Sequence, residues 1–314
     1  MQLKVSEQDI NQRLDKYLAR ELGDLSRTEI QKRVKAGLVE VNKKIASAHL
    51  ALKEGDEIVL IEKPEEEKIN NFDLKIIHEE EGFVVVYKPA GILMHPTGVS
   101  NEKTLIDKVI EKYPKVKKIS DIESKNSHLR PGVVHRLDRE VSGLVVIALN
   151  QDNFDWLKKQ WQTRQVTKKY QALVYGQIEN DEGKINTPLI RNKQGLMVAR
   201  SDNKKSEAKN SLTEYKVLKK FINYTLVEIN LKTGRTHQIR AHFKSIGNSV
   251  VADELYKTKT KNPTDKRRLE SDKKHLGRIF LHAYYLAFKG IDEKRYEFVS
   301  PLPQQLQDFL NKVK

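Results

Sequence analysis

The chain carries at residues 135–149 the stretch His135-Arg136-Leu137-Asp138-Arg139-Glu140-Val141-Ser142-Gly143, which continues as Leu144-Val145-Val146-Ile147-Ala148-Leu149. The second part is a near-continuous apolar run and predicts a strand in the interior of a sheet. The first part therefore predicts a charged loop on a rigid scaffold, where catalytic groups usually lie. Arg136 and Arg139 flank Asp138, and nearby cations favour an ionised carboxylate, which can act as nucleophile or base. A surface cluster of ion pairs is the alternative that this stretch leaves open.

A second polar cluster follows another expected strand. The segment 231–243 reads Leu-Lys-Thr-Gly-Arg-Thr-His-Gln-Ile-Arg-Ala-His-Phe. Gly234 permits a tight turn, and we expect Thr236 to cap a helix after it. Arg235 and Arg240 could then reach across to one anion.

Other kinds of enzyme are poorly supported. His237 and His242 are five residues apart, not the four that place two metal ligands on one helix face, so we expect no metal site. A protein kinase also has a His-Arg-Asp sequence, but Leu137 intervenes here and the Gly-rich loop is missing. A glycoside hydrolase needs two cooperating carboxylates, and Glu140 is only a sequence neighbour of Asp138.

The remaining patterns predict an α+β fold for residues 72–314. Amphipathic patterns predict a helix at 152–161 and a final helix that begins near Ser300. Strands are expected at 83–88, 144–149, 170–175 and 224–231. This order favours a large mixed, mainly antiparallel sheet over a doubly wound one, and the Gly-rich turn of a nucleotide-binding fold is missing.

Residues 1–63 predict a separate small domain built from a helix pair and a small sheet. One helix face is predicted from Ile10, Leu14, Tyr17, Leu18 and Leu22. A capping box at Ser26-Arg27-Thr28-Glu29 opens a second helix, and strands are expected at 38–41 and 57–61. The Pro- and Glu-rich run at 64–68 is typical of an exposed linker. We therefore place a linker at 64–71 and the larger domain at 72–314.

The composition is that of a charged polypeptide without cysteine. Its 314 residues include 58 Lys and Arg against 43 Asp and Glu, a formal net charge of +15. The length suggests two domains, and the lack of Cys excludes disulfides and thiolate metal sites. No apolar run is long enough to span a membrane, and the N-terminus has charges where a signal peptide is apolar. We expect a cytoplasmic protein with no membrane partner.

The positive charge is concentrated beyond residue 63, because the charges of residues 1–63 nearly balance. A net charge of this size predicts a polyanion partner, and a lysine-rich solvated surface is the alternative. The segment 257–278 has nine Lys and Arg against three Asp and Glu. Asn262-Pro263 interrupts this segment, so we predict an exposed and mobile loop, either a clamp on RNA or a solvated insertion.

Several motifs within residues 1–63 resemble the S4 RNA-binding domain. They are Arg13-Leu14-Asp15-Lys16-Tyr17-Leu18, Ser26-Arg27, Gly37-Leu38-Val39-Glu40-Val41-Asn42 and Gly55-Asp56. A helix with clustered cations can lie against a phosphate backbone. The resemblance implies RNA contacts by Arg27, Lys32 and Arg33.

Residues 72–312 resemble the RluA-type pseudouridine synthases, in the branch that includes RluC and RluD. The motifs are Tyr87-Lys88-Pro89-Ala90-Gly91-Ile92-Leu93-Met94-His95-Pro96, the nonamer at 135–143, Lys169-Tyr170-Gln171-Ala172, the segment 233–242 and Leu281-His282-Ala283. An S4 domain ahead of the synthase domain is the common arrangement in this branch. Two positions depart from the family pattern: Val141 stands where Thr is usual, and Ala252 stands where Gly precedes Asp253.

The resemblance implies isomerisation of uridine in RNA: the N1–C1′ bond breaks, the uracil turns, and C5 joins C1′, with no cofactor or metal. Asp138 would be the essential carboxylate, which attacks C1′, adds to C6 or helps to abstract a ribose proton. Tyr170 would stack on the uracil and help to move the C5 proton. Arg240, or in second place Arg235, would pair with Asp138. Arg136 would enter the RNA stack where the flipped base leaves it.

The resemblance also implies RNA contacts by His135, Arg139, Lys169, Thr236 and His237. The expected partner is structured RNA, by default large-subunit (23S) ribosomal RNA or a pre-ribosomal particle, and the protein is expected to be a monomer. Transfer RNA is the alternative substrate. A non-catalytic RNA-binding or ribosome-assembly protein that retains the fold is the alternative function. A DNA-binding protein is a weaker interpretation, since no helix-turn-helix or zinc motif is present.

Overall fold

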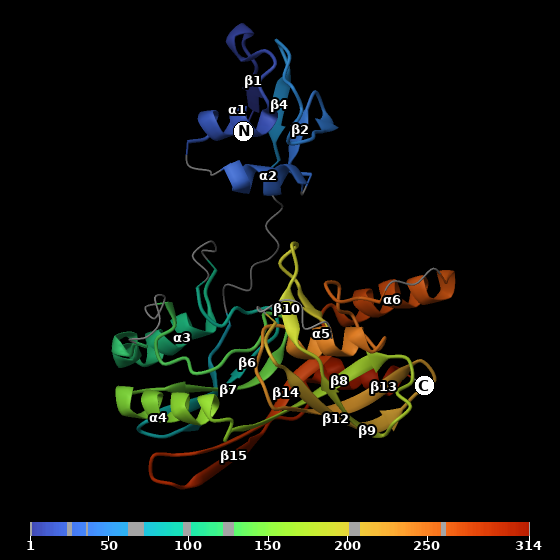
Figure 1. Cartoon of the computed structure of the whole chain (residues 1–314). Coiled ribbons are helices and arrows are strands. Elements are labelled where there is room, and N and C mark those ends of the chain that lie inside the picture. Colours follow the sequence, from blue (N-terminus) through green and yellow to red (C-terminus); the bar gives the residue numbers. More distant parts are fainter. Residues whose placement is uncertain are drawn as a thin grey trace. The chain divides into compact units, whose positions relative to one another are not determined.

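The computed structural model describes residues 2–23, 27–35, 37–61, 72–96, 102–121, 129–200, 208–258 and 262–313. Its contacts divide the chain into two compact units, Met1–Lys68 and Ile69–Lys314 (Figure 1). The division falls within the segment 64–71 that we expected to be a linker, and that segment lies outside the described residues. In the described part of the chain, no helix is long and apolar enough to cross a membrane.

The first unit is a helix pair with a small antiparallel sheet. The helices are α1 (Leu14–Glu21) and α2 (Arg27–Lys35), and the strands are β1 (Gln2–Lys4), β2 (Val39–Val41), β3 (Lys44–Ile45) and β4 (Glu57–Leu60), in the order β1-β4-β2-β3. Both helices bury one face in a common core with the sheet. Ile30 and Val34 of α2 are buried there, as their spacing predicts.

The first helix is shorter than the sequence pattern predicts. Ile10 is 41% exposed and lies outside α1. Asn11 has a left-handed backbone (φ 66°), and a helix cannot continue through this conformation. The helix therefore begins only at Leu14, and the inclusion of Ile10 in its apolar face was wrong. Ser26 of the expected capping box lies outside the described residues.

The second unit is built on a nine-stranded sheet in the order β5-β6-β7-β14-β8-β13-β12-β9, with β15 paired to β14. The strands are β5 (Lys75–Glu79), β6 (Phe83–Lys88), β7 (Ser142–Ala148), β8 (Thr167–Tyr175), β9 (Glu182–Asn186), β12 (Leu212–Lys220), β13 (Tyr224–Leu231), β14 (Leu281–Lys289) and β15 (Arg295–Val299). Among the strand pairings of the described residues, only β7 with β14 is parallel. The predicted mixed, mainly antiparallel α+β fold is confirmed.

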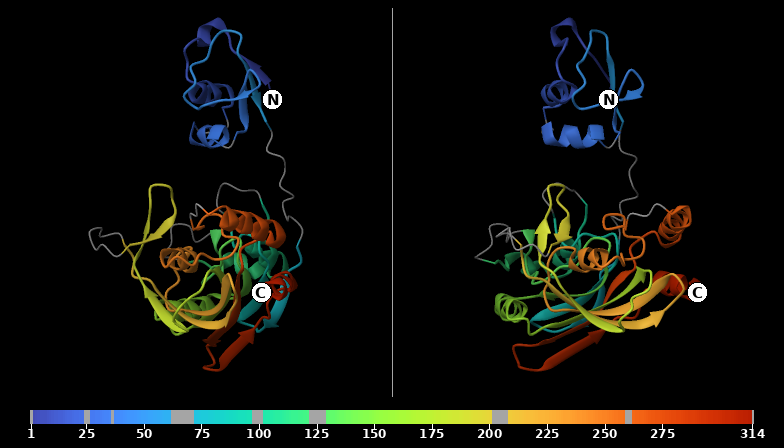
Figure 2. Two further views of the ribbon diagram at one scale, coloured as in Figure 1. Left: turned by 90° about the vertical axis from the view of Figure 1, so that its right-hand side faces the viewer. Right: turned by 45° about the vertical axis from the view of Figure 1, so that its right-hand side comes forward.

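Helices cover this sheet from both sides. They are α3 (Leu105–Lys112), α4 (Gln151–Gln162), α5 (Gln238–Ser245), α6 (Pro263–Leu276) and α7 (Gln304–Lys312). The helix α5 lies over one face of β8, β13 and β12 (Figure 2) and buries Phe243 in the main core. The helix α7 buries Leu306 and Phe309 against Leu173 of β8, whose side chain points to the opposite face from that of Tyr170. A short hairpin of β10 (Leu189–Arg191) and β11 (Met197–Ala199) stands beside α5.

The parallel junction between β7 and β14 fixes the end of the charged loop. Gly143 faces Ala283 with φ 138°, and a Cβ at Gly143 would lie 2.2 Å from the carbonyl oxygen of Ala283. Only glycine fits there. Ser142 accepts a hydrogen bond from Arg278 and donates one to Nδ1 of His282, whose Nε2 donates to the carbonyl of Ser300. The junction thus holds the start of β7 through backbone contact and a buried polar chain.

The basic segment 257–278 is largely helical, and the prediction of a mobile loop there was wrong. The interruption at Asn262-Pro263 is the start of α6: the Asn262 side chain accepts a hydrogen bond from the Thr264 N–H at 2.9 Å, and Pro263 is the first helical residue. Gly277, in the left-handed conformation, ends the helix. Tyr224 anchors α6 to the sheet by donating to the buried carboxylate of Asp272.

Acid will destabilise the β7–β14 junction because His282 is fully buried as a neutral ring. Burial lowers the pKa of His282 to about 4 from its ordinary value of 6.5. Between these values the unfolded chain binds a proton that the folded protein does not bind, so the free energy of unfolding falls as the pH drops below about 6.5. We expect His282 alone to cause a loss of about 2 kcal/mol between pH 7 and pH 5.

Urea denaturation of the wild type and of His282→Gln at these two pH values measures this contribution. Glutamine can still accept from Ser142 and donate to Ser300, but it does not titrate. The pH-dependent loss should therefore be smaller in the variant by about 2 kcal/mol. An equal loss in both proteins would show that another group carries the acid sensitivity.

Candidate active site

A pocket of about 280 Å³ opens in the second unit, between the loop before β7, the strand β8 and the start of α5. It is lined by most of the site residues expected from the sequence: Asp138, Tyr170, Arg240, Arg235, Arg136, His135, Thr236 and His237. Arg139 and Lys169 do not line it. Segments far apart in the sequence therefore meet at one site.

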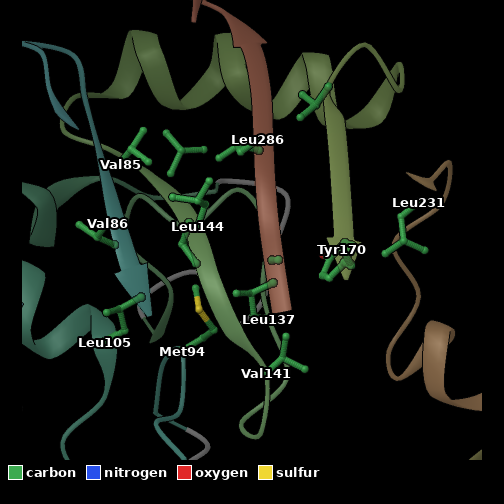
Figure 3. Close-up of a cluster of buried hydrophobic side chains, with 14 of the residues drawn as sticks. Val85, Val86, Met94, Leu105, Leu137, Val141, Leu144, Tyr170, Leu231 and Leu286 are labelled. Atoms are coloured by element: carbon green, nitrogen blue, oxygen red, sulfur yellow. The ribbon is translucent and has the colours of Figure 1, made fainter. Parts of the chain in front are cut away.

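Apolar anchors turn the charged loop so that Asp138 faces the pocket. Leu137 and Val141 are buried in the main core, where Figure 3 shows them in the same cluster as Met94 and Tyr170. Between them the chain turns, with the N–H of Val141 donating to the carbonyl of Asp138 at 3.1 Å. The Asp138 side chain remains 16% exposed. The buried side chains of Leu137 and Val141 thus hold the loop so that the carboxylate of Asp138 faces the pocket.

A buried lysine, whose role the sequence pattern does not reveal, also holds the loop in place. Lys88, at the end of β6, is fully buried, and its Nζ donates to the carbonyls of Pro89, Ile92 and Arg139 at 2.8–3.0 Å. Burial lowers the pKa of Lys88 to about 7, whereas the three carbonyl acceptors match the three donors of an ammonium group. Arg139 returns the contact by donating from Nε to the carbonyl of Gly91.

Arg240 lies beside Asp138 and is itself held by a second carboxylate. Its Nη1 is 3.5 Å from Oδ2 of Asp138. Its Nε and Nη2 donate to Oδ2 and Oδ1 of Asp253 at 2.6 and 2.9 Å. Burial opposes the charge of Arg240, but the bonds to Asp253 outweigh burial and raise the pKa of the guanidinium. The planar, fork-shaped guanidinium of Arg240 is therefore fixed by Asp253, with its third nitrogen directed at Asp138.

Arg235, the second candidate partner of Asp138, has a different position. It is exposed at the rim of the pocket. Among the described residues, no ion pair joins it to Asp138.

His237 and Tyr256 complete the surroundings of the carboxylate. Nε2 of His237 is 3.9 Å from Oδ2 of Asp138. The hydroxyl of Tyr256 accepts from the N–H of Met197 at 3.0 Å and is hydrogen-bonded to Nδ1 of His237 at 2.9 Å. Burial lowers the pKa of His237, and the ring of Tyr256 packs against Arg240.

The strand β8 directs Tyr170 and Lys168 into the pocket and Lys169 to the opposite face. Successive side chains of a strand alternate between faces. Tyr170 is 7% exposed and lines the pocket with Lys168, while Nζ of Lys169 is 3.1 Å from Glu228 outside it. Lys169, which we expected to contact RNA, therefore does not line this pocket, whereas the period of two along the strand could have identified Lys168 as the lysine on the face of Tyr170.

The loop between β13 and α5 is closed by Gln238 rather than by Thr236. The side-chain oxygen of Gln238 accepts from the N–H of Arg235 and the hydroxyl of Thr233. The residue before α5 is His237, which has a left-handed backbone (φ 52°) and makes no side-chain cap. The predicted cap by Thr236 is therefore wrong. In this tight loop the buried side-chain amide of Gln238 binds the backbone N–H of Arg235 instead.

Two of the predicted RNA contacts are engaged within the protein. Nε2 of His135 accepts from the N–H of Val146 at 3.1 Å, and its ring stacks on Trp161. Arg139 pairs with Glu102 at 2.9 Å besides its bond to Gly91. Arg136 is exposed at the pocket.

In the first unit, Arg27 links the two helices. It lies 3.0 Å from Asp15 of α1, which is fully buried and is also bound by Arg13 and Gln31. Burial alone would raise the pKa of Asp15, but these hydrogen bonds lower it below its usual range. Arg27 keeps 46% of its side chain exposed, and Arg33 is exposed as well. The side chain of Lys32 lies outside the described residues.

The two departures from the family pattern have simple structural settings. Val141 is 2% exposed, where an apolar side chain packs well. Ala252 has a left-handed backbone (φ 61°), the conformation that glycine adopts at least cost. Within the described part of the chain, no group of three or more His, Cys, Asp or Glu could hold a metal ion.

Arg240→Lys tests the buried fork. Lysine keeps the charge but cannot donate two parallel bonds to Asp253 while reaching Asp138. We expect the free energy of unfolding to fall by about 2–3 kcal/mol, measured by urea denaturation. Arg235→Lys, an exchange at the exposed arginine of the same loop, should leave stability unchanged. Equal stability of Arg240→Lys and the wild type would contradict the role given to this fork.

Comparisons with known proteins agree with this geometry. A family model described as RNA pseudouridylate synthase matches residues 82–245, and an S4 domain model matches residues 12–58. YlyB of Bacillus subtilis, named an uncharacterized RNA pseudouridine synthase, is 33% identical over 320 residues, which cover 99% of this chain and 97% of YlyB. Ribosomal large subunit pseudouridine synthase D of Neisseria meningitidis serogroup B is 32% identical over 307 residues, which cover 95% of this chain and 78% of the relative.

A solved structure shares the fold of the larger unit. Human RNA Pseudouridylate Synthase Domain Containing 1 superposes with a TM-score of 0.57 at 24% identity, covering 77% of this chain and 87% of the human one. The family match spans more than half of the chain and includes the loop that carries Asp138. The chain therefore belongs to the RNA pseudouridylate synthase family, with an S4 domain ahead of its synthase domain.

Proposed function

We propose that Asp138 is the essential carboxylate of this pseudouridine synthase and that its substrate is large-subunit ribosomal RNA. The observation that carries the catalytic part is the position of Asp138: a carboxylate on an anchored loop, 3.5 Å from a buried guanidinium, in a pocket also lined by Tyr170. An adjacent cation favours the anionic form of a carboxylate. In that form Asp138 can attack C1′, add to C6 of the uracil or act as a base toward the ribose.

Tyr170 forms an apolar wall for the base. Burial, helped by the negative charge of Asp138, raises the pKa of the Tyr170 phenol well above its usual value. The hydroxyl therefore keeps its proton at neutral pH. This supports Tyr170 as a stacking surface and hydrogen-bond donor rather than as a base that starts the reaction in its deprotonated form.

The pocket accepts a nucleoside only after the nucleoside has left its stack. Base flipping costs a few kcal/mol, and a planar side chain can fill the vacated space. Arg136 is exposed at the pocket and has the right chemistry, since a guanidinium stacks on bases. We therefore propose that the guanidinium of Arg136 fills the gap that the flipped base leaves in the RNA stack.

The ribosomal substrate rests on the relatives. Two of them, from Neisseria meningitidis and Haemophilus ducreyi, are named ribosomal large subunit pseudouridine synthase D and match 95% and 99% of this chain. An S4 domain supplies a second RNA-binding surface for a large structured substrate. The proposal keeps the cytoplasmic location and the monomeric state expected from the sequence. Transfer RNA remains the alternative substrate.

Asp138→Asn tests the catalytic assignment. Asparagine has the same shape, but it cannot act as nucleophile or base. We expect pseudouridine formation on transcribed RNA to fall at least about a thousandfold, while RNA affinity stays near that of the wild type. Glu140→Gln, in the same loop but outside the pocket lining, is the matched control and should retain activity. Undiminished turnover by Asp138→Asn would exclude Asp138 as the essential group.

Mapping of pseudouridine at single-nucleotide resolution, in cells with and without the gene, tests the substrate. We expect the loss of one or a few pseudouridines in large-subunit ribosomal RNA and none in transfer RNA. Loss confined to transfer RNA would overturn the ribosomal assignment. An unchanged map in both RNAs would favour a non-catalytic RNA-binding protein.

A further inference from the structure

A second pocket adjoins the one that contains Asp138. It has a volume of about 360 Å³ and lies between the end of α4, the start of β8 and the loop after β13. The two pockets share a wall made of Trp161, Lys168, Leu231, Gly234 and Arg235. The two pockets are therefore immediate neighbours.

The second pocket is lined by cations and by no carboxylate among the described residues. Its basic residues are Arg164, Lys168, Lys232 and Arg235. Only Lys232 has a carboxylate partner in the described part of the chain, Glu214 at 3.3 Å. A concave surface with one sign of charge concentrates ions of the opposite sign. The pocket therefore suits an anion.

Lys168 is the cation best placed to meet such an anion. It is half-buried, it lies on the wall common to both pockets, and it has no ion-pair partner among the described residues. Burial lowers the pKa of Lys168. A half-buried charge without a partner is costly, and an anion that arrives with a substrate would offset that cost. Gly234 lies beside Lys168, since an added Cβ would be 3.9 Å from Nζ, which is ordinary van der Waals contact.

The chemistry of RNA supplies such an anion at this place. A nucleotide that enters the first pocket remains joined to its neighbours, so a backbone phosphate follows it to each side of the opening. Arg130 and Arg136 line the first pocket only, whereas Lys168 and Arg235 line both pockets. A phosphate on the side of the second pocket would therefore meet Lys168 and Arg235.

We propose that the second pocket binds a backbone phosphate of the RNA strand next to the target nucleotide, with Lys168 as its main contact and Arg235 at its rim. This site rests on the proposed function, because it places the flipped nucleotide in the pocket of Asp138. It also assigns Arg235 to the phosphate rather than to Asp138. The ligand class is a phosphodiester, read by charge without regard to base identity.

The test is the salt dependence of RNA binding by Lys168→Met. The probe is a stem-loop RNA whose uridines are confined to the loop, and binding is measured by fluorescence anisotropy over a series of salt concentrations. Methionine keeps the apolar stem of the side chain, so the fold should persist, and thermal unfolding checks this. Loss of one phosphate contact should reduce the slope of log affinity against log salt by about one and weaken low-salt binding about tenfold.

Two further variants control the result. Lys168→Arg restores a cation at the same place and should recover most of the slope. Lys216→Met removes a lysine of the same sheet that pairs with Glu182 and lines neither pocket, so it should leave the slope unchanged. If Lys168→Met unfolds, Lys168→Gln takes its place.

A slope for Lys168→Met equal to that of the wild type would overturn the phosphate site, even if turnover falls. That combination would mean that Lys168 contacts the uracil instead. Equal loss of slope in Lys168→Met and Lys216→Met would also overturn it, because any lysine would then have the same effect. Anisotropy reports binding whether or not the RNA is converted, so a protein that forms no pseudouridine refutes the proposed function but leaves this comparison valid.

Discussion

The site depends on the ion pairs made by the buried guanidinium of Arg240. This guanidinium is almost inaccessible to water, and an unpaired charge there would be costly. Asp253 neutralises it through two parallel hydrogen bonds, which also fix the plane of the fork. The remaining nitrogen then faces Asp138 at 3.5 Å. The carboxylate of Asp253 is fully buried in this pairing, whereas that of Asp138 remains partly exposed to the pocket.

The fold places Asp138 through constraints that lie behind the loop. Gly143 permits the close parallel approach of β7 to β14, and Lys88 ties the loop to the end of β6 through three carbonyls. Leu137 and Val141 are buried on either side of the carboxylate. These contacts fix the backbone rather than the side chain of Asp138. The site can therefore remain open to a substrate while its geometry is set by the core.

Much of the fold could be predicted from the sequence because the strands have strong local patterns. The apolar runs at 83–88 and 144–149 correspond to β6 and β7, and the alternation at 224–231 corresponds to β13. The helix α6 was not predicted, because most of its residues are charged and few apolar residues mark its buried face. Its capping residues, Asn262 and Pro263, are also typical of a loop. The first helix was extended to Ile10 because periodicity does not report the left-handed backbone of Asn11.

Part of the candidate site could also be predicted from local sequence patterns. Local motifs identified Asp138, Tyr170 and Arg240, whose neighbours in sequence carry the signal. Asp253 and Tyr256 were missed because their roles come from contacts across the fold, which no local spacing reveals. Lys88 gave no sign of burial, since a lysine at the end of a strand is usually solvated.

The central claim is that a uridine leaves its stack and lies between Tyr170 and Asp138. A structure of the Asp138→Asn protein with a bound RNA that contains the mapped uridine tests it most directly. The account predicts that the uracil packs on the ring of Tyr170 and that C1′ and C6 of this nucleotide face residue 138. A uridine that stays stacked in the RNA, or that binds away from this pocket, would contradict it.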